Sequence, residues 1–236
     1  MTERVIAIVP ARSGSKGFPN KNLARIGGRT LLELAVLVAR DARCVDEVYV
    51  STDSAEYERV AFAAGARSAG LRPAELSGDS VKTSTVVVAL LRHIGMTDGI
   101  VVLLQPTSPM RSPDDVDAVV EMMRDERIDA VATVERLHEP HPAKVKRRDQ
   151  NGLLHPYVPG ASSETPRQEL PEAFRLSGAI YAVRVPVLIE QQTFLPPRTY
   201  GHPVEPGVNI DREEDFLFLE TLVKSGRVRL HGIKED

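Results

Sequence analysis

The sequence predicts an α/β fold in which helices cover both faces of a mostly parallel central sheet. Short apolar runs rich in β-branched residues alternate with longer Leu- and Ala-rich segments over residues 5–134, and polar loops separate them. This β-α order implies parallel strands joined by right-handed crossovers. A chain of 236 residues can bury one substantial core, so we expect a single domain over residues 1–236 with room for a small appendage.

The first part of the chain supplies two predicted strands and two predicted helices. Residues 5–10 are continuously apolar, which is typical of a central strand covered on both faces, and residues 47–51 form a second strand. Residues 30–40 have the length and the Leu and Ala content of a helix. Asp53, with a glutamate three residues further on, has the spacing of a capping box and predicts a helix that stops at Gly65.

The middle of the chain continues the same alternation. Residues 71–82 contain Pro, Gly and Ser and few apolar residues, which indicates a loop. Ser112, followed by a proline and two aspartates, is typical of a helix N-cap and its first turn. The predicted elements are a helix over 83–93, a strand over 99–104, a helix over 112–124 and a strand over 129–134.

Residues 138–177 interrupt this order. They are rich in Pro, Arg, Glu and Gln and contain no long apolar run. Because strand character resumes over residues 178–183, we expect an ordered arm inserted into the domain rather than a linker. A last strand is predicted over residues 208–211, followed by a final helix over residues 212–224 with Asp211 in its capping box.

Composition excludes several classes of protein. The net charge of −3 gives no overall basic field, so we expect no nucleic-acid partner. Cys44 is the single cysteine, which rules out an intrachain disulfide and a Cys-rich zinc site. No run approaches the ~18 apolar residues of a membrane span. The N-terminal apolar run is too short for a signal peptide, so we expect a cytoplasmic protein with no membrane partner.

The loop that follows the first strand is both basic and rich in glycine. Over residues 7–23 it contains Arg12, Ser15 and Lys21 together with Gly14 and Gly17. Glycines let backbone N–H groups approach an anion, and Arg and Lys add full positive charge, so the loop predicts a polyphosphate site. The spacing is not that of a Walker A motif. The alternative is a solvated basic turn whose glycines serve only its geometry.

Other polar residues follow the remaining strands of the predicted sheet. The carboxyl ends of parallel strands meet at one edge, where α/β proteins bind their ligands. We therefore expect Arg72, Thr83, the turn that begins at Gln105, and Asp211 to surround one cleft together with the basic loop.

Five segments of the chain, in order, resemble one family of enzymes. They are PARSGSKGFPNKNL, LRPAEL, LLQPTSPMR, RQELPEAFRLSGAIY and NIDREEDF. Together they look like the motif set of the acylneuraminate (CMP-sialic acid) cytidylyltransferases. The resemblance implies a Rossmann-like nucleotidyltransferase fold and transfer of CMP from CTP to the anomeric hydroxyl of a 2-keto acid sugar, a small anionic acceptor. It also implies magnesium as cofactor and a homodimer formed partly by the arm over residues 138–177.

The resemblance assigns roles position by position. Arg12 and Lys21 would bind the triphosphate and, with Asp211, act in catalysis. Residues implied in nucleotide binding are Arg12, Ser15, Lys21, Asn22, Arg72 and Thr83, the last two around the cytidine. Residues implied in acceptor binding are Gln105, Lys144 and Arg167, the last two as partners of its carboxylate and polar groups, and Asp211 would bind magnesium. For Lys144 a solvated basic face is the alternative, and for Asp211 a helix cap.

The chain departs from the family pattern at two positions. The family has two aspartates one residue apart at its metal site, whereas this chain has Asn209 before Ile210 and Asp211. An amide oxygen can bind magnesium but has no charge. Ser177 replaces an asparagine at a position expected to face the acceptor. Two alternatives follow: a cytidylyltransferase for a smaller acid such as phosphonoformate, and a CTP-binding regulatory protein without turnover.

Overall fold

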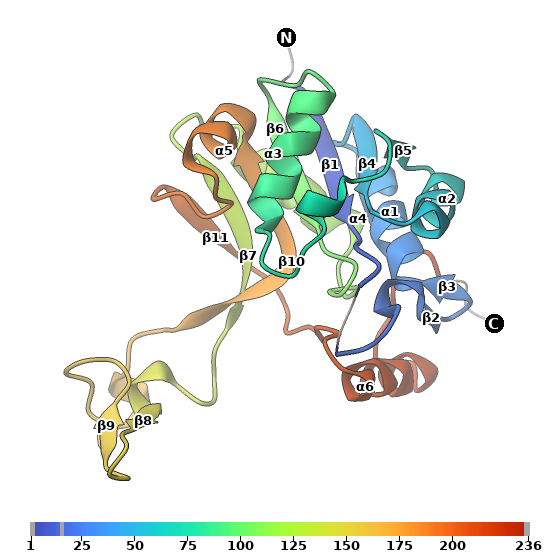
Figure 1. Cartoon of the computed structure of the whole chain (residues 1–236). Helices are drawn as coiled ribbons and strands as arrows, with labels where there is room; N and C mark the ends of the chain where they lie inside the picture. Colours follow the sequence, from blue (N-terminus) through green and yellow to red (C-terminus); the bar gives the residue numbers. More distant parts are fainter. Residues whose placement is uncertain (1–2, 15–16, 234–236) are drawn as a thin grey trace.

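The computed structural model describes residues 3–14 and 17–233 and has a seven-stranded sheet at its centre (Figure 1). The strand order is β11-β7-β10-β6-β1-β4-β5. Neighbouring strands are parallel, except that β10 is antiparallel to both β6 and β7. The strands are β1 (Val5–Pro10), β4 (Glu47–Ser51), β5 (Arg67–Ser68), β6 (Ile100–Leu104), β7 (Ala130–Arg136), β10 (Phe174–Arg184) and β11 (Thr199–Pro203). The predicted, mostly parallel sheet is confirmed.

Helices cover both faces of this sheet. On β1, Val5, Ala7 and Val9 pack into one apolar cluster with α1, α2 and α4, whereas Ile6 and Ile8 pack into a second with α3 and α5. This division follows from the period of two in a strand, which sends successive side chains to opposite faces. The helices are α1 (Leu31–Asp41), α2 (Ala55–Ala64), α3 (Thr83–His93), α4 (Pro113–Met122), α5 (Val185–Gln191) and α6 (Glu213–Lys224).

Capping residues determine where several helices begin. Thr30 accepts a hydrogen bond from the backbone N–H of Glu33, whose carboxylate accepts one from the N–H of Thr30, so α1 has a complete capping box. Ser112 caps α4 in the same way, with a proline at the first helical position, as predicted. Gly65 ends α2 with a φ of +109°, a conformation that favours glycine.

Three local predictions are wrong. The N-cap of α2 is Ser54, because the carboxylate of Asp53 accepts hydrogen bonds from Ser13 instead. The segment over residues 208–211 is not a strand, although its Ile210 N–H donates to the neighbouring Thr107 carbonyl at 2.8 Å. The cap of α6 is Arg212, and Asp215 rather than a glutamate accepts hydrogen bonds from the N–H groups of Asp211 and Arg212.

The arm extends from the sheet between β7 and β10 (Figure 1). It contains a small antiparallel hairpin and two single-turn helices, whose bounds are β8 (Lys146–Arg148), β9 (Leu154–Pro156), η3 (Pro142–Lys144) and η4 (Arg167–Glu169). Leu153, Leu154 and Tyr157 on this arm are each more than 60% exposed. The arm therefore has secondary structure of its own, and it leaves large apolar side chains in contact with solvent.

Four further short elements belong to the domain. The short strands β2 (Arg25–Ile26) and β3 (Arg29–Thr30) form a hairpin after the single-turn helix η1 (Lys21–Leu23). A second single-turn helix, η2 (Ala74–Leu76), lies in the loop before α3. Helix α6 packs with Ile210 and the start of α1 in a third apolar cluster, which holds the segment before α6 near the basic loop. No helix among the described residues has the length and hydropathy needed to cross a bilayer.

Candidate active site

The carboxyl ends of β1 and β6 lie beside each other and open into a cavity of about 460 Å³. This is where the strand order reverses, the usual ligand position in open α/β sheets. The predicted residues that line the cavity are Arg12, Lys21, Asn22, Arg72, Thr83, Gln105 and Asp211. The structure thus brings together residues from the basic loop, two later loops, the start of α3 and the segment before α6. Ser15 lies outside the described residues.

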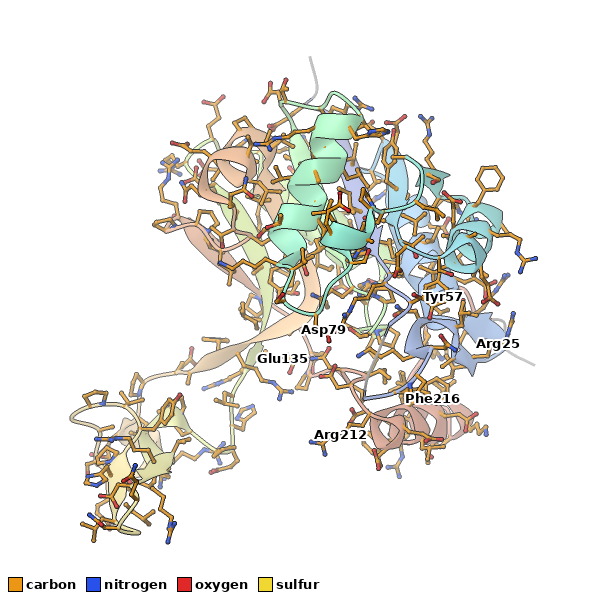
Figure 2. The ribbon with its side chains drawn as sticks, in the orientation of Figure 1. Arg25, Tyr57, Asp79, Glu135, Arg212 and Phe216 are labelled. Carbon is orange, nitrogen blue, oxygen red and sulfur yellow. The ribbon has the colours of Figure 1, made fainter. Side chains whose placement is uncertain are left out.

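Arg12 and Lys21, the cations of the basic loop that lie within the described residues, each pair with a carboxylate of the same cavity. Arg12 forms an ion pair with Asp79, which lies on the loop below α3 (Figure 2). The Nζ atom of Lys21 donates to the Ile210 carbonyl at 2.9 Å and to Asp211 Oδ1 at 3.1 Å. The side chain of Lys21 is 17% exposed and that of Asp211 is 80% exposed. Together with Arg72, the described residues of the cavity wall therefore present three cationic side chains and two carboxylates.

The basic loop is held by contacts that place its cations. Asn22 is buried, and its Nδ2 atom donates to the Arg12 carbonyl at 3.2 Å. Asp53 accepts from the backbone N–H of Ser13 at 2.8 Å and from its hydroxyl at 3.0 Å. A Cβ atom on Gly17 would lie 2.8 Å from the Asp211 carbonyl oxygen, so glycine is required for this close approach. Asn22 and Asp53 therefore hold the backbone of the loop in place by hydrogen bonds.

Arg72 connects the cavity to the end of β4. Its Nε atom donates to the Ser51 hydroxyl at 3.2 Å, and its Nη2 atom donates to the Ser51 carbonyl. Burial lowers the pKa of this guanidinium. Because one edge of the side chain is fixed against the sheet, its position on the cavity wall is set before a ligand arrives.

Arg111 is a functional residue that the sequence analysis did not single out. It is buried, and its Nη1 atom donates to the carbonyls of Gln105 and Ser108, both at 2.7 Å, and of Ala179 at 3.1 Å. Burial lowers the pKa of Arg111 to about 9, so the group stays charged at neutral pH. Its Nε and Nη2 atoms have no hydrogen-bond partner among the described residues. Arg111 therefore fixes the turn that presents Gln105. Its signal in the sequence was the arginine that ends the LLQPTSPMR segment.

A second cavity of about 470 Å³ adjoins the first. Thr83 and Gln105 line both, so the two cavities meet at these side chains. The second cavity also contains residues that sequence reasoning missed: Lys82, Ser84, Tyr181, Gln191, Gln192, Thr193 and Phe194. Most come from β10 and from the end of α5, which the sequence analysis had treated only as a strand and a Pro-rich stretch.

Asn209 does not line either of these cavities. Its Oδ1 atom accepts from the Ser108 hydroxyl at 2.5 Å, and its Nδ2 atom donates to the Ser177 carbonyl at 3.0 Å. Ser177 is itself buried, and its hydroxyl bonds to that of Thr133 at 2.6 Å. The expectation that Ser177 faces an acceptor is therefore wrong, because its buried hydroxyl bonds to Thr133 on β7 instead.

Asp211 is the predicted metal ligand that does reach the first cavity. An exposed carboxylate beside the cations of the first cavity suits magnesium, which needs one or two carboxylates and completes its shell with phosphate oxygens and water. Over residues 3–14 and 17–233 no group of three or more His, Cys, Asp or Glu side chains is placed to hold a metal.

Lys144 and Arg167 lie on the arm and line neither cavity of their own chain. Arg167 contacts Glu139 at 3.7 Å and the Nδ1 atom of His138 at 3.2 Å. The structure therefore separates these two from Gln105, with which the sequence analysis had grouped them.

Cations beside a sheet edge, next to a second polar cavity, define a nucleotide-binding α/β protein with room for a second substrate. A cytidylyltransferase family model matches residues 6–200, and the chain belongs to that family. The predicted family of nucleotidyltransferases is thereby confirmed.

Individual relatives agree with this assignment. The chain is 29% identical over 234 residues to a CMP-N,N'-diacetyllegionaminic acid synthase of Legionella pneumophila, covering 94% of this chain and 97% of that one. It is 29% identical over 216 residues to an N-acylneuraminate cytidylyltransferase of Streptococcus agalactiae, covering 90% of this chain but only 51% of that longer one.

A solved structure shows the same fold. A CMP:2-keto-3-deoxy-manno-octonic acid synthetase complexed with CTP aligns with a TM-score of 0.71 at 20% identity, over 94% of this chain and 99% of that chain. A 4-diphosphocytidyl-2C-methyl-D-erythritol synthase aligns with a TM-score of 0.63 at 14% identity. At these identities the likeness shows the nucleotidyltransferase fold alone.

Proposed function

We propose that the protein transfers CMP from CTP to the anomeric hydroxyl of a 2-keto acid sugar of the nonulosonic type and releases pyrophosphate. The observation behind this proposal is the pair of adjoining cavities that meet at Thr83 and Gln105. The first, with three cationic side chains, suits the nucleotide, and the second, lined by amides, hydroxyls and aromatic rings, suits a sugar. The names of the relatives point to the same acceptor class.

In this transfer, the residues of the chain mainly position the two substrates and neutralise the negative charge that develops. The acceptor hydroxyl attacks the α-phosphorus, the bond to the β-phosphate oxygen breaks, pyrophosphate leaves in line, and the hydroxyl proton passes to solvent. Arg12 and Lys21 would leave Asp79 and Asp211 to neutralise the triphosphate and the charge that develops on pyrophosphate. Gln105, held by Arg111, would orient the acceptor at the junction.

Magnesium is part of this proposal. Asp211 would hold the ion, which when bound would polarise the phosphoryl oxygens. Removing Asp211 would also free Lys21 from its ion pair, so metal dependence and activity must be measured together.

A homodimer is also proposed. The apolar side chains of Leu153, Leu154 and Tyr157 on the arm form an exposed group of the kind that marks protein interfaces. A second copy of the chain, related by two-fold symmetry, would cover them and would bring Lys144 and Arg167 to the site of its partner.

The two alternatives lose support. The proposal of a smaller acid such as phosphonoformate depended on Asn209 and Ser177. The Asn209 side chain bonds to Ser108 and to the Ser177 carbonyl, the Ser177 hydroxyl bonds to Thr133, and neither residue lines the second cavity. The proposal of a regulatory protein depended on the missing aspartate at position 209, which does not line the first cavity in any case.

The test is pyrophosphate release from CTP with a panel of acceptors. The panel holds N-acylneuraminic acid, N,N'-diacetyllegionaminic acid, 2-keto-3-deoxy-manno-octonic acid and phosphonoformate, each with and without magnesium. We expect pyrophosphate release that requires both a sugar acid and magnesium. In Asp211→Ala we expect both this release and its dependence on magnesium to be lost. Turnover of phosphonoformate alone would favour the smaller acceptor. CTP binding by calorimetry without turnover of any acid would favour the regulatory protein.

A further inference from the structure

We propose that Lys82 binds the carboxylate of the acceptor acid and so determines acceptor specificity. This inference rests on the function proposed above. It concerns the second cavity and names a residue to which neither the sequence motifs nor the family resemblance gave a role.

The charges of the two cavities differ. The first has Arg12, Lys21 and Arg72 on its walls, and it also has two carboxylates, Asp79 and Asp211. Among the described residues, the second cavity has no acidic side chain on its walls, and Lys82 is the one lining residue with a charge. A carboxylate that entered the second cavity would meet no like charge and one opposite charge.

Lys82 is available for a ligand. It is exposed, directly precedes the first residue of α3, and forms no ion pair with any residue in the part of the chain that the structure describes. Arg12 and Lys21, in contrast, are each engaged by a carboxylate. The ammonium of Lys82 can therefore bind an anion without first losing a partner.

The chemistry of the acceptor determines where its carboxylate must lie. In a 2-keto acid sugar, the carboxylate and the attacking hydroxyl are attached to the same carbon. When the hydroxyl approaches the α-phosphorus, the carboxylate must therefore lie beside the junction of the two cavities rather than at the far end of the second. Thr83 lines both cavities, and Lys82 is its neighbour in the chain on the side of the second.

The other cations expected to meet the acceptor are placed differently. Lys144 and Arg167 lie on the arm and line neither cavity of their own chain. They could act only on a partner's site, whereas Lys82 supplies positive charge within each chain. The position of Lys82 also explains specificity for an acid over a neutral sugar without a second subunit.

The experiment measures acceptor kinetics of Lys82→Gln with the acid that the wild type uses best, and with its methyl ester. Arg92→Gln is the matched control, because it removes one positive charge from the exposed surface of the same helix and lines neither cavity. A hydrogen-bonded ion pair contributes enough to change affinity by about tenfold to a hundredfold. We expect the KM for the acid to rise by that factor in Lys82→Gln, while the KM for CTP stays within about twofold.

The ester separates a charge contact from a general disturbance. The wild type and Arg92→Gln should prefer the acid to the ester, and Lys82→Gln should lose most of that preference. An unchanged preference in Lys82→Gln, with a wild type that turns over sugar acids, would overturn the role of Lys82 alone. A wild type that turns over none of the sugar acids would overturn the proposed function and this inference with it.

Discussion

At the scale of single residues, Lys21 links the phosphate side of the site to the segment before α6. Its ammonium lies between the Ile210 carbonyl and the Asp211 carboxylate, and its side chain is mostly buried. The contact to the carbonyl fixes the position of the positive charge, and the contact to the exposed carboxylate is one that a triphosphate can replace. The fold therefore fixes the position of the Lys21 ammonium, and a substrate phosphate can replace the Asp211 carboxylate as its ionic partner.

We expect Lys21→Ala to lower turnover by about 10²–10³-fold, the usual effect of removing one aimed charge from a transfer site. The fold should persist, because the partners of Lys21 are a carbonyl and an exposed carboxylate. Steady-state rates and circular dichroism check both parts. Lys224→Ala, on the exposed surface of α6, is a control that removes the same side chain. Activity close to that of the wild type would show that the loop has a smaller role than proposed.

Arg111 acts on the site through backbone carbonyls rather than by contact with a substrate. In Arg111→Met, the buried carbonyls of Gln105, Ser108 and Ala179 lose their donor. We expect the free energy of unfolding to fall by about 1–3 kcal/mol in urea titrations, since relief of the buried charge offsets part of the loss.

The KM of Arg111→Met for the acceptor should rise more than its KM for CTP, because Gln105 would lose its orientation. Arg124→Met, which removes an exposed arginine paired with Glu121, is the control. Equal changes in both KM values would contradict a specific effect on the Gln105 turn.

At the scale of elements, the segment over residues 209–211 connects three parts of the fold. Asn209 bonds to Ser108 after β6 and to Ser177 in β10, and the backbone of Ile210 bonds to Thr107 and Lys21. The amide of Asn209 both donates and accepts. An ionised carboxylate only accepts, so it could not bond to the Ser177 carbonyl.

Asn209→Asp therefore should not create a second metal ligand. We expect turnover to fall and the magnesium concentration for half-maximal activity to stay within about twofold, because the new carboxylate would face a carbonyl outside the first cavity. A magnesium titration of the variant checks this. Higher activity at lower magnesium would show instead that position 209 can reach the metal.

Elements with local signals were predicted well. The helix α3 has the predicted bounds, 83–93, and Ser112 caps α4, because apolar spacing and capping residues determine these features locally. Asp53 was misassigned, since its partner Ser13 is forty residues away and competes with the cap. The loops around Asp79 and Phe194 have no local pattern, so their place on the cavity walls required the fold.

At the scale of the whole molecule, the arm joins the domain through β7 and β10. At its base, Glu135 is buried and accepts from Arg175 at 2.7 Å and from the Gly207 N–H at 3.0 Å, where β7 leaves the sheet (Figure 2). These hydrogen bonds attach the base of the arm to the sheet. The far part of the arm is the region expected to meet a second copy of the chain.

Subunit mixing tests whether the arm completes a partner's site. One variant, Arg12→Ala, should lose the function of its own first cavity. The other, which combines Lys144→Ala with Arg167→Ala, should lose the function of its arm. Each variant alone should be nearly inactive. A refolded equal mixture should regain about a quarter of wild-type activity, since half the dimers would be mixed and each would have one intact site. No recovery, with dimers present in sedimentation, would show that each arm serves its own chain or no site.

The hydrogen bonds of the described arm residues stay within the arm, as in the pairs Asp149–His155 and His141–Pro171, or join it to its two supporting strands. The arm is thus an exchangeable module. Its length and side chains can change during evolution without disturbing the sheet that holds the nucleotide. Transplanting the arm of a relative onto β7 and β10 is therefore a practical test of whether the arm contributes to the choice of acid, with the KM for CTP as the measure of an intact domain.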